Sequence, residues 1–162
     1  MRLTPLLLSV LSATALVACA PQSGSAGSTA QATPAVHEVS GLPVVPLTVQ
    51  AGGSTHRFQV EVAESAEAQA RGLMFRTELG ADEGMIFPYR APQQLSFWMR
   101  NTVLPLDLIF IGADNRVINV VANAVPYSED QLMSEGPAIA VLELNGGRAA
   151  QLGIGPGALV RW

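Results

Sequence analysis

The sequence predicts an all-β domain, a compact sandwich or barrel that carries two short helices. From about residue 44 to residue 162, short segments alternate hydrophobic with polar side chains, and Gly, Pro, Asn and Asp separate them. An alternation with a period of two is typical of strands, and these four residue types favour turns. Only two short stretches have helical spacing, so we expect the helices to be minor parts of a β structure.

The first expected elements are a hairpin and a short helix. Residues 44–50 and 55–63 flank the sequence Ala-Gly-Gly-Ser at 51–54, which is typical of a hairpin connection. Ser65 precedes a segment with helical spacing over 66–73. Its hydroxyl can accept a hydrogen bond from a free backbone N–H of the first turn, so we expect it to cap this helix.

Further strands and one helical turn complete the expected domain. Hydrophobic side chains occupy both faces of residues 106–112, so this strand is expected to be buried on both sides. The sequence Ala-Asp-Asn at 113–115 favours a turn into the next strand. The expected strands are 95–100, 106–112, 116–122, 139–145 and 158–162, with a helical turn at 148–152.

Composition excludes several classes of function. The chain has no lysine, which excludes a lysine Schiff base and a Walker-type phosphate loop. Its formal net charge is −4 and it has no basic cluster, so we expect no binding to nucleic acid. The single cysteine excludes an intrachain disulfide and a cysteine zinc site. Two histidines, His37 and His56, are too few for a histidine-rich centre, and we expect no metal and no cofactor.

The N-terminus predicts export and attachment to a membrane by lipid. Arg2 precedes an apolar run over residues 5–17, which is typical of a signal peptide and shorter than the ~20 residues that a membrane-spanning helix needs. The run ends in Leu-Val-Ala-Cys at 16–19, which resembles a bacterial lipobox. In lipoproteins of that kind the cysteine thiol is acylated and the chain is cut before it. We therefore expect a lipoprotein-type signal peptide over 1–18 and lipid attachment at Cys19.

The residues after this cysteine predict a tether. Residues 20–35 contain only Ala, Ser, Gly, Thr, Pro and Gln, which bury too little apolar surface to fold. We expect the lipidated cysteine and a flexible tether over 19–43, followed by the β domain over 44–162. The domain is then extracytoplasmic, anchored by lipid to a membrane of the bacterial cell envelope or periplasm. The alternative is ordinary signal-peptide cleavage and a secreted, soluble protein.

Two residues of the expected strand 95–100 are candidates for binding. Trp98 and Arg100 share one face by the count of two. A large aromatic ring beside a guanidinium can stack on a ligand ring or a peptide. The alternative interpretation is that Trp98 fills a second hydrophobic layer under the helix at 66–73.

An acidic residue in a strand buried on both sides is a further candidate. Asp107 begins the strand 106–112, and its carboxylate needs a partner because burial of an isolated charge is very costly. Arg76 or Arg100 is the expected cation, with a hydrogen-bond donor from Asn101 or Thr102. Such a cluster is either an ion pair that fixes the preceding loop or a polar recognition site.

A second carboxylate would permit catalysis. Glu143 shares a face with Val141 and Asn145 by the same count of two. Paired with Asp107 or Glu83, it would supply the two carboxyls that glycoside hydrolysis requires.

Several linked motifs occur in order along the domain: Arg71-Gly72-Leu73-Met74-Phe75-Arg76, Glu83-Gly84-Met85-Ile86-Phe87, Ser96-Phe97-Trp98-Met99-Arg100-Asn101-Thr102, Pro105-Leu106-Asp107 and Val141-Leu142-Glu143-Leu144. Together they resemble the signature of the DUF192 family over roughly residues 56–161. The resemblance implies a compact β domain similar to a jelly roll, which is often exported. It implies no established activity.

The function expected from these observations is binding without catalysis. We expect an accessory module of the cell envelope whose ligand or protein partner contacts one face of the domain. The rival hypotheses are a small hydrolase or lyase that uses Asp107 with Glu83 or Glu143, and an assembly partner with an exposed apolar patch. Of these hypotheses the sequence favours the non-catalytic one, and an enzyme is the alternative. The expected binding face consists of Arg76, Glu83, Trp98, Arg100, Asn101 and Asp107.

Overall fold

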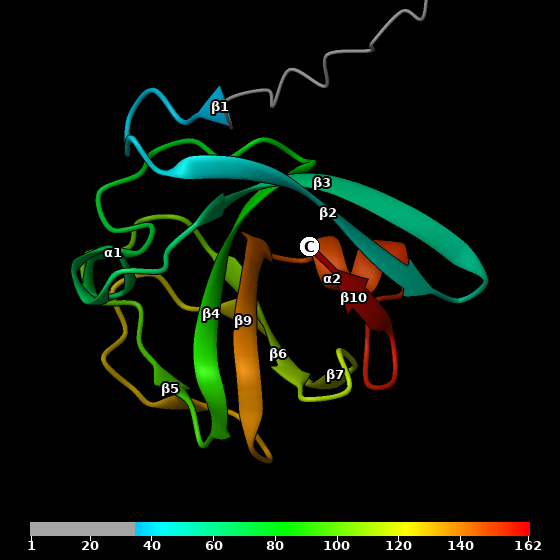
Figure 1. Cartoon of the computed structure of the whole chain (residues 1–162). Helices are drawn as coiled ribbons and strands as arrows, with labels where there is room; N and C mark the ends of the chain where they lie inside the picture. The colour runs from blue at the N-terminus through cyan, green and yellow to red at the C-terminus, as the bar shows by residue number, and fades with distance from the viewer. Residues whose placement is uncertain (1–34) are drawn as a thin grey trace, which may run out of the picture. The chain divides into compact units, whose positions relative to one another are not determined.

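The computed structural model of the protein describes residues 35–162 (Figure 1). The expected signal peptide at 1–18, the lipid attachment at Cys19 and most of the expected tether lie outside the described residues. Within 35–162, no helix is both long and apolar enough to cross a membrane.

The described part is mostly strand, with two short helices, which confirms the expected all-β class. Several of the strands are long enough to build a sheet, and the shortest, β1, β5 and β8, contain two residues each. In chain order the elements are β1 (Ala35–Val36), β2 (Pro43–Ala51), β3 (Ser54–Val62), α1 (Ala66–Arg71), β4 (Glu83–Gln93), β5 (Ser96–Phe97), β6 (Leu106–Gly112), β7 (Val117–Ala124), β8 (Leu132–Met133), β9 (Ala138–Asn145), α2 (Arg148–Leu152) and β10 (Leu159–Arg161).

One large sheet organises the domain. Its strand order is β1-β2-β3-β4-β9-β6-β7, and β10 pairs with β2, while β5 and β8 form a separate small hairpin-like pair. All pairings are antiparallel except that of β3 with β4. Between β7 and β10 there is a single isolated bridge, Arg116 with Leu159. The sheet is therefore strongly curled but is not a closed barrel.

The two faces of this sheet bury two separate hydrophobic cores. Alternate residues of a strand point to opposite faces. On β9, Leu142 and Leu144 point into the first core, which α2 covers through Ala149. Val141 points into the second core, which α1 and the β5 segment cover. Figure 1 shows α1 and α2 on opposite sides of the neighbouring strands β4 and β9.

Three elements differ from the sequence expectation. The long strand β4 was not expected, because Pro88 and Pro92 disfavour a strand, and the pairing of β4 with β9 is irregular between Pro88 and Gln93. The expected strand 95–100 is reduced to β5. The end of the expected tether is folded, since β1 pairs with the start of β2.

Candidate functional site

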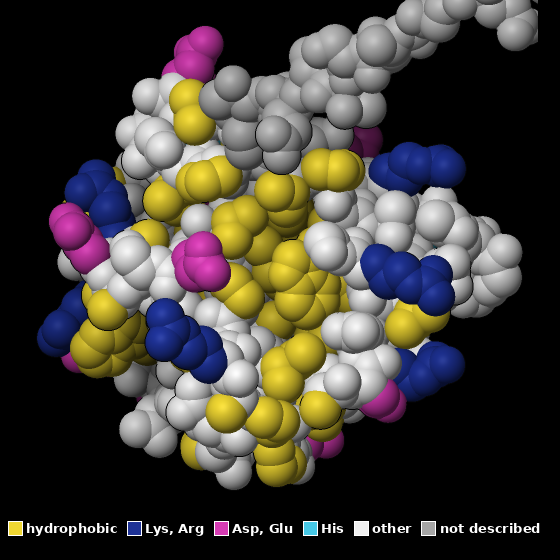
Figure 2. All heavy atoms as spheres, viewed as in Figure 1, with side chains coloured by type: hydrophobic (Ala, Val, Ile, Leu, Met, Phe, Trp, Pro, Cys, Tyr) yellow, Lys and Arg dark blue, Asp and Glu magenta, His cyan; other side chains and the backbone are white. Residues whose placement is uncertain are grey.

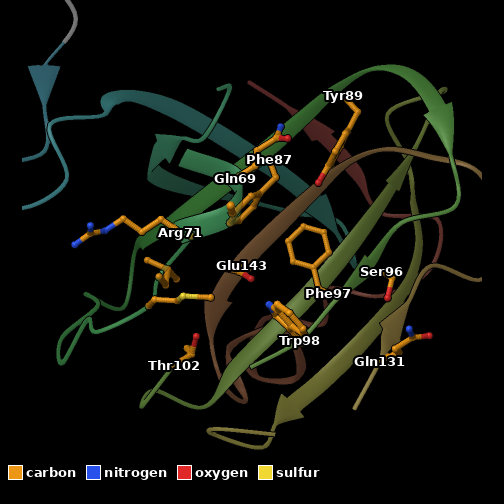
Figure 3. Close-up of a pocket in the computed structure, with 14 residues that line it drawn as sticks. Gln69, Arg71, Phe87, Tyr89, Ser96, Phe97, Trp98, Thr102, Gln131 and Glu143 are labelled. Atoms are coloured by element: carbon orange, nitrogen blue, oxygen red, sulfur yellow. The ribbon is translucent and has the colours of Figure 1, made fainter. Parts of the chain in front are cut away.

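A cleft of about 430 Å³ lies on the face of the sheet that buries the second core (Figure 3). It is bounded by α1, by the strands β4 and β9, and by the segment around β5. We call it the α1 cleft. Its floor is formed by β4 and β9, and its sides by α1 and by the residues that follow β5. The α1 cleft is lined by Gln69, Ala70, Arg71, Gly72, Leu73, Met74, Phe87, Tyr89, Ser96, Phe97, Trp98, Thr102, Gln131 and Glu143.

Local interactions fix α1 beside the floor. The Ser65 hydroxyl accepts a hydrogen bond from the N–H of Ala68 at 3.1 Å, which caps the helix as the sequence predicts. The Gln69 side chain donates to the carbonyl of Pro88 at 2.9 Å and so ties α1 to β4. Gly72 ends the helix with a φ of 49°, and a Cβ there would lie 3.3 Å from the ring of Phe87. A glycine at this position lets the chain pass close to the aromatic floor.

The side chain of Glu143 occupies the floor of the α1 cleft. Its neighbours in register are Met85 on β4 and Leu108 on β6, both apolar. The residue is 4% exposed, and within residues 35–162 its buried Oε2 has no hydrogen-bond partner. No arginine or histidine of the described residues forms an ion pair with it. Glu143 is therefore a buried carboxyl with acceptor capacity that the described part of the protein leaves unused.

Burial raises the pKa of Glu143 from 4.5 to about 8. The cause is desolvation, which disfavours the charged form. At pH 7 this carboxyl is consequently protonated and neutral, and it offers one O–H donor as well as acceptor oxygen. Tyr89 also has a raised pKa, mainly because of its burial and then because of the charge of ionised Glu143. Its hydroxyl points into the cleft in Figure 3 and stays protonated.

Aromatic rings form the sides of the α1 cleft. Phe87 and Phe97 meet edge to face with their centroids 5.1 Å apart, and Phe97 also contacts Phe110 of the second core. Such packing holds the rings rigidly. Trp98 is 46% exposed, and the guanidinium of Arg100 lies 4.5 Å from the centroid of its ring. Trp98 therefore lines the cleft instead of filling a layer beneath α1.

Asp107 does not line the α1 cleft. It is fully buried and accepts hydrogen bonds from the backbone N–H groups of Asn123, Gly147 and Ala149 at 2.8, 2.9 and 2.7 Å. Neither Arg76 nor Arg100 is its partner, contrary to the sequence expectation. Backbone donors from β7 (Asn123), from the N-cap of α2 (Gly147) and from its first turn (Ala149) replace the expected ion pair.

The sheet register separates Asp107 from Glu143. Residues opposite one another in an antiparallel pair share a face. Asp107 is opposite Leu144, and Leu108 is opposite Glu143. The two carboxyls therefore point to opposite faces of the sheet, and the expected acid–base pair between them does not form.

Arg76 and Glu83 lie outside the α1 cleft, beside a different surface hollow. Arg76 donates to the buried Oε1 of Glu61 at 2.6 Å and approaches His37 Nε2 at 3.1 Å. Glu83 accepts from the N–H of Gly80 at 2.8 Å. These contacts hold the surrounding loops in place. Neither Arg76 nor Glu83 lines the α1 cleft with Trp98.

The remaining candidate, Asn101, occupies a tight turn. Its φ is 56°, in the left-handed region that asparagine tolerates, and its side chain approaches the sulfur of Met74 at 3.8 Å. Of the six residues expected to bind, only Trp98 lines the α1 cleft, and Arg100 contacts Trp98 from outside. Sequence reasoning missed Phe87 and Tyr89, although they alternate correctly for one face of a strand.

The described residues hold no group of three or more His, Cys, Asp and Glu side chains placed to bind a metal. The α1 cleft itself contains one carboxyl and no histidine. A hard cation such as Ca²⁺ takes six to eight oxygen ligands, so this lining does not suit one.

Comparisons with known proteins cover most of the chain. The model of the family DUF192, described as "Uncharacterized ACR", matches residues 47–162. A crystal structure of a protein of unknown function from Novosphingobium aromaticivorans is 58% identical with a TM-score of 0.78, covering 82% of this chain and 94% of that one. Another, of a protein from Sinorhizobium meliloti proposed to be a transcription regulator, is 36% identical with a TM-score of 0.72, covering 74% and 94%. Comparison with curated proteins gave no match.

Proposed function

The chain belongs to the DUF192 family, and from that premise we propose that it is a non-catalytic binding module of the bacterial cell envelope, with the α1 cleft as its binding site. The family description assigns no activity, so the proposal rests on the geometry of the site and on the N-terminal sequence.

The unpartnered carboxyl of Glu143 at the floor of an aromatic cleft carries the proposal. A buried polar group without a partner costs on the order of 1–3 kcal/mol. A ligand that supplies the missing partner removes this cost when it binds. The rigid rings around the carboxyl add apolar contact area with little loss of side-chain entropy, which is typical of small-molecule sites.

The lining of the α1 cleft supports binding over hydrolysis. Its titratable side chains are Arg71, Tyr89 and Glu143. Hydrolysis by two carboxyls needs a second one across the same cleft, within ~10 Å. Asp107 points to the other face of the sheet, and Glu83 lines a separate hollow. A serine nucleophile would need a histidine base, and no histidine lines the cleft.

Contact with DNA has no support from charge. The chain has a net charge of −4 and no lysine, and among residues 35–162 one arginine, Arg71, lines the cleft. Neutralisation of phosphates supplies most non-specific affinity for DNA, and the nine arginines of this chain are outnumbered by 13 acidic residues and form no basic cluster in the sequence.

Replacement of Trp98 by Ala is expected to weaken ligand binding at least tenfold while the melting temperature stays within a few degrees. The ring is about half exposed, so its loss removes more contact with a ligand than with the core. A small-molecule library screened by thermal shift identifies ligands, whose affinities are then measured by calorimetry for both proteins.

Trp162→Ala is the matched control, because Trp162 is similarly exposed and does not line the α1 cleft. It should leave every affinity unchanged. A library without a single ligand, or ligands that bind Trp98→Ala as tightly as the wild type, would refute the proposed binding site.

The lipobox-like sequence at 16–19 supports the proposed place of the protein in the envelope. A lipid-anchored protein from the membrane fraction should show an intact mass that includes diacylglycerol on Cys19, and Cys19→Ser should lose it and leave the membrane. Two or three acyl chains hold a protein on a bilayer durably, at about 0.8 kcal/mol per buried CH₂. An unmodified wild-type protein in the soluble fraction would indicate ordinary secretion.

A further inference from the structure

Resting on the proposed binding function, we propose that the α1 cleft takes an organic cation, an alkylammonium or guanidinium group that pairs with the carboxylate of Glu143 between the aromatic walls. The inference names the ligand class for the site. It draws on three observations within the described residues: the missing partner of Glu143, the aromatic walls around it, and the absence of a cation that pairs with it at the floor.

Glu143 differs from the other buried carboxyls of residues 35–162. Asp107 accepts three backbone hydrogen bonds. Glu61 has Arg76 and the hydroxyl of Ser40 as partners. Glu143 has an apolar neighbour on each flanking strand and a buried Oε2 without a donor. The donor that would satisfy it has to come from outside the described fold.

The walls favour a positively charged donor over a neutral one. Phe87, Phe97 and Trp98 surround the carboxyl, and the negative faces of aromatic rings attract cations. Trp98 already accepts one cation on its ring, the guanidinium of Arg100 at 4.5 Å. A carboxylate surrounded by aromatic rings attracts an ammonium or guanidinium group through its negative charge and through the quadrupoles of the rings.

No cation from residues 35–162 pairs with Glu143 at the floor. Arg71 is the cation of the lining, and its side chain points away from Glu143 in Figure 3. Arg100 is held outside the cleft by Trp98 and by Glu129, at 3.0 Å. From β4 the titratable neighbour is Tyr89, which stays neutral, and β6 presents Leu108. Among the described residues, neither arginine near the α1 cleft therefore pairs with the carboxyl that a ligand cation would meet.

Outside the cleft, one face of the domain carries mainly hydrophobic side chains at its centre, with arginines and acidic residues towards the margins (Figure 2). Apart from Trp98, the exposed large hydrophobic residues are dispersed over several loops, the short strands β1 and β8 and the C-terminal end: Val36, Val39, Phe75, Val103, Val125, Tyr127, Met133 and Trp162. These residues do not indicate what kind of partner would bind, whereas the unpaired carboxyl of Glu143 in the α1 cleft indicates a cationic ligand.

Binding of a cation must be linked to loss of a proton. Free Glu143 is protonated below its pKa of about 8, and it must ionise to pair with the cation. Affinity is therefore expected to rise about tenfold per pH unit up to about pH 8 and then level off. A neutral ligand with a hydrogen-bond acceptor would give the reverse, a constant affinity that falls above pH 8.

The test compares n-butylamine with n-butanol on the full-length protein by calorimetry, at about pH 6, 7 and 8.5. The two probes share a chain and differ in charge at the head. We expect n-butylamine to bind with rising affinity over this range, with release of about one proton per molecule at the lowest pH, and n-butanol to bind at least tenfold more weakly at the highest.

Glu143→Gln keeps the shape of the side chain and removes its charge, and it should abolish binding of n-butylamine. Glu135→Gln removes one charge from an exposed residue outside the cleft and should change nothing. Preserved binding in Glu143→Gln, equal binding of n-butanol, or affinity that falls with pH would overturn the inference. No binding of n-butylamine to the wild type would overturn it as well.

The source of the cation is separated by a third probe, a lysine residue capped at both ends. Tighter binding of capped lysine than of n-butylamine indicates a polypeptide side chain, and weaker binding indicates a free amine; both support a cation site. If n-butylamine fails while library ligands bind in a way that depends on Trp98, the ligand class is wrong and the proposed function stands. If neither binds, both fail.

Discussion

Asp107→Ala is expected to lower the free energy of unfolding by about 4–6 kcal/mol, a large part of the about 5–15 kcal/mol that stabilises a typical domain. The carboxylate is fully buried and accepts the backbone N–H groups of Asn123, Gly147 and Ala149. Truncation leaves three buried donors without partners, and each costs on the order of 1–3 kcal/mol. Urea denaturation followed by circular dichroism measures the loss.

Two variants keep this prediction testable if the alanine variant does not fold. In Asp107→Asn, an oxygen at the Oδ1 position still accepts from Asn123 and Gly147, while the amide group opposes the N–H of Ala149. We expect about half the loss. Asp114→Ala removes an exposed turn residue with one backbone contact and should cost less than about 1 kcal/mol. If Asp107→Ala were as stable as Asp114→Ala, the three hydrogen bonds would not stabilise the fold.

This residue also shows what sequence can and cannot reveal. The pattern of residues 106–112 correctly predicts that the strand is buried on both faces and that Asp107 needs partners. Its partners are backbone N–H groups of β7 and of the start of α2, and no side-chain pattern encodes where the fold places them. The cations that the sequence suggested, Arg76 and Arg100, pair instead with Glu61 and Glu129.

Two prolines explain why the sequence does not predict β4, the strand that forms part of the floor of the α1 cleft. Phe87 and Tyr89 alternate as a strand would require, but Pro88 lies between them and Pro92 follows, and both disfavour a strand. Here Pro88 still pairs in register with Ala140 before the pairing becomes irregular. Tertiary packing of β4 against β9 overrides the local signal.

Trp98 and Glu143 were recognised, but their relation to one another was not. The period-two count placed Trp98 on the face opposite Phe97, whereas β5 ends at Phe97 and both rings line the cleft. The count placed Glu143 correctly on the face of Val141, yet it could not say that Asp107 pairs with Leu144 across the sheet. Register decides which carboxyls meet, and register depends on long-range pairing.

Glu143→Gln is expected to stabilise the protein at high pH and to leave its stability unchanged near pH 5. In the folded protein the pKa of Glu143 is about 8, against 4.5 as its ordinary value. Between these values the unfolded chain loses the proton that the folded chain keeps, so stability falls as pH rises and levels off above about pH 8. At about 1.4 kcal/mol per pKa unit the loss is on the order of 3–5 kcal/mol.

The glutamine amide stays neutral at every pH, so the variant does not share this loss. Below about pH 4.5 both proteins carry an uncharged side chain at this position, and their free energies of unfolding should agree. At about pH 9 the variant should be more stable by about 3–5 kcal/mol, measured by urea denaturation across the pH range. Glu135→Gln, which changes an exposed carboxylate, should parallel the wild type throughout. A difference between Glu143→Gln and wild type that stays flat with pH would mean that the folded protein solvates or pairs the Glu143 carboxylate, and the site would then have no unmet charge to offer a ligand.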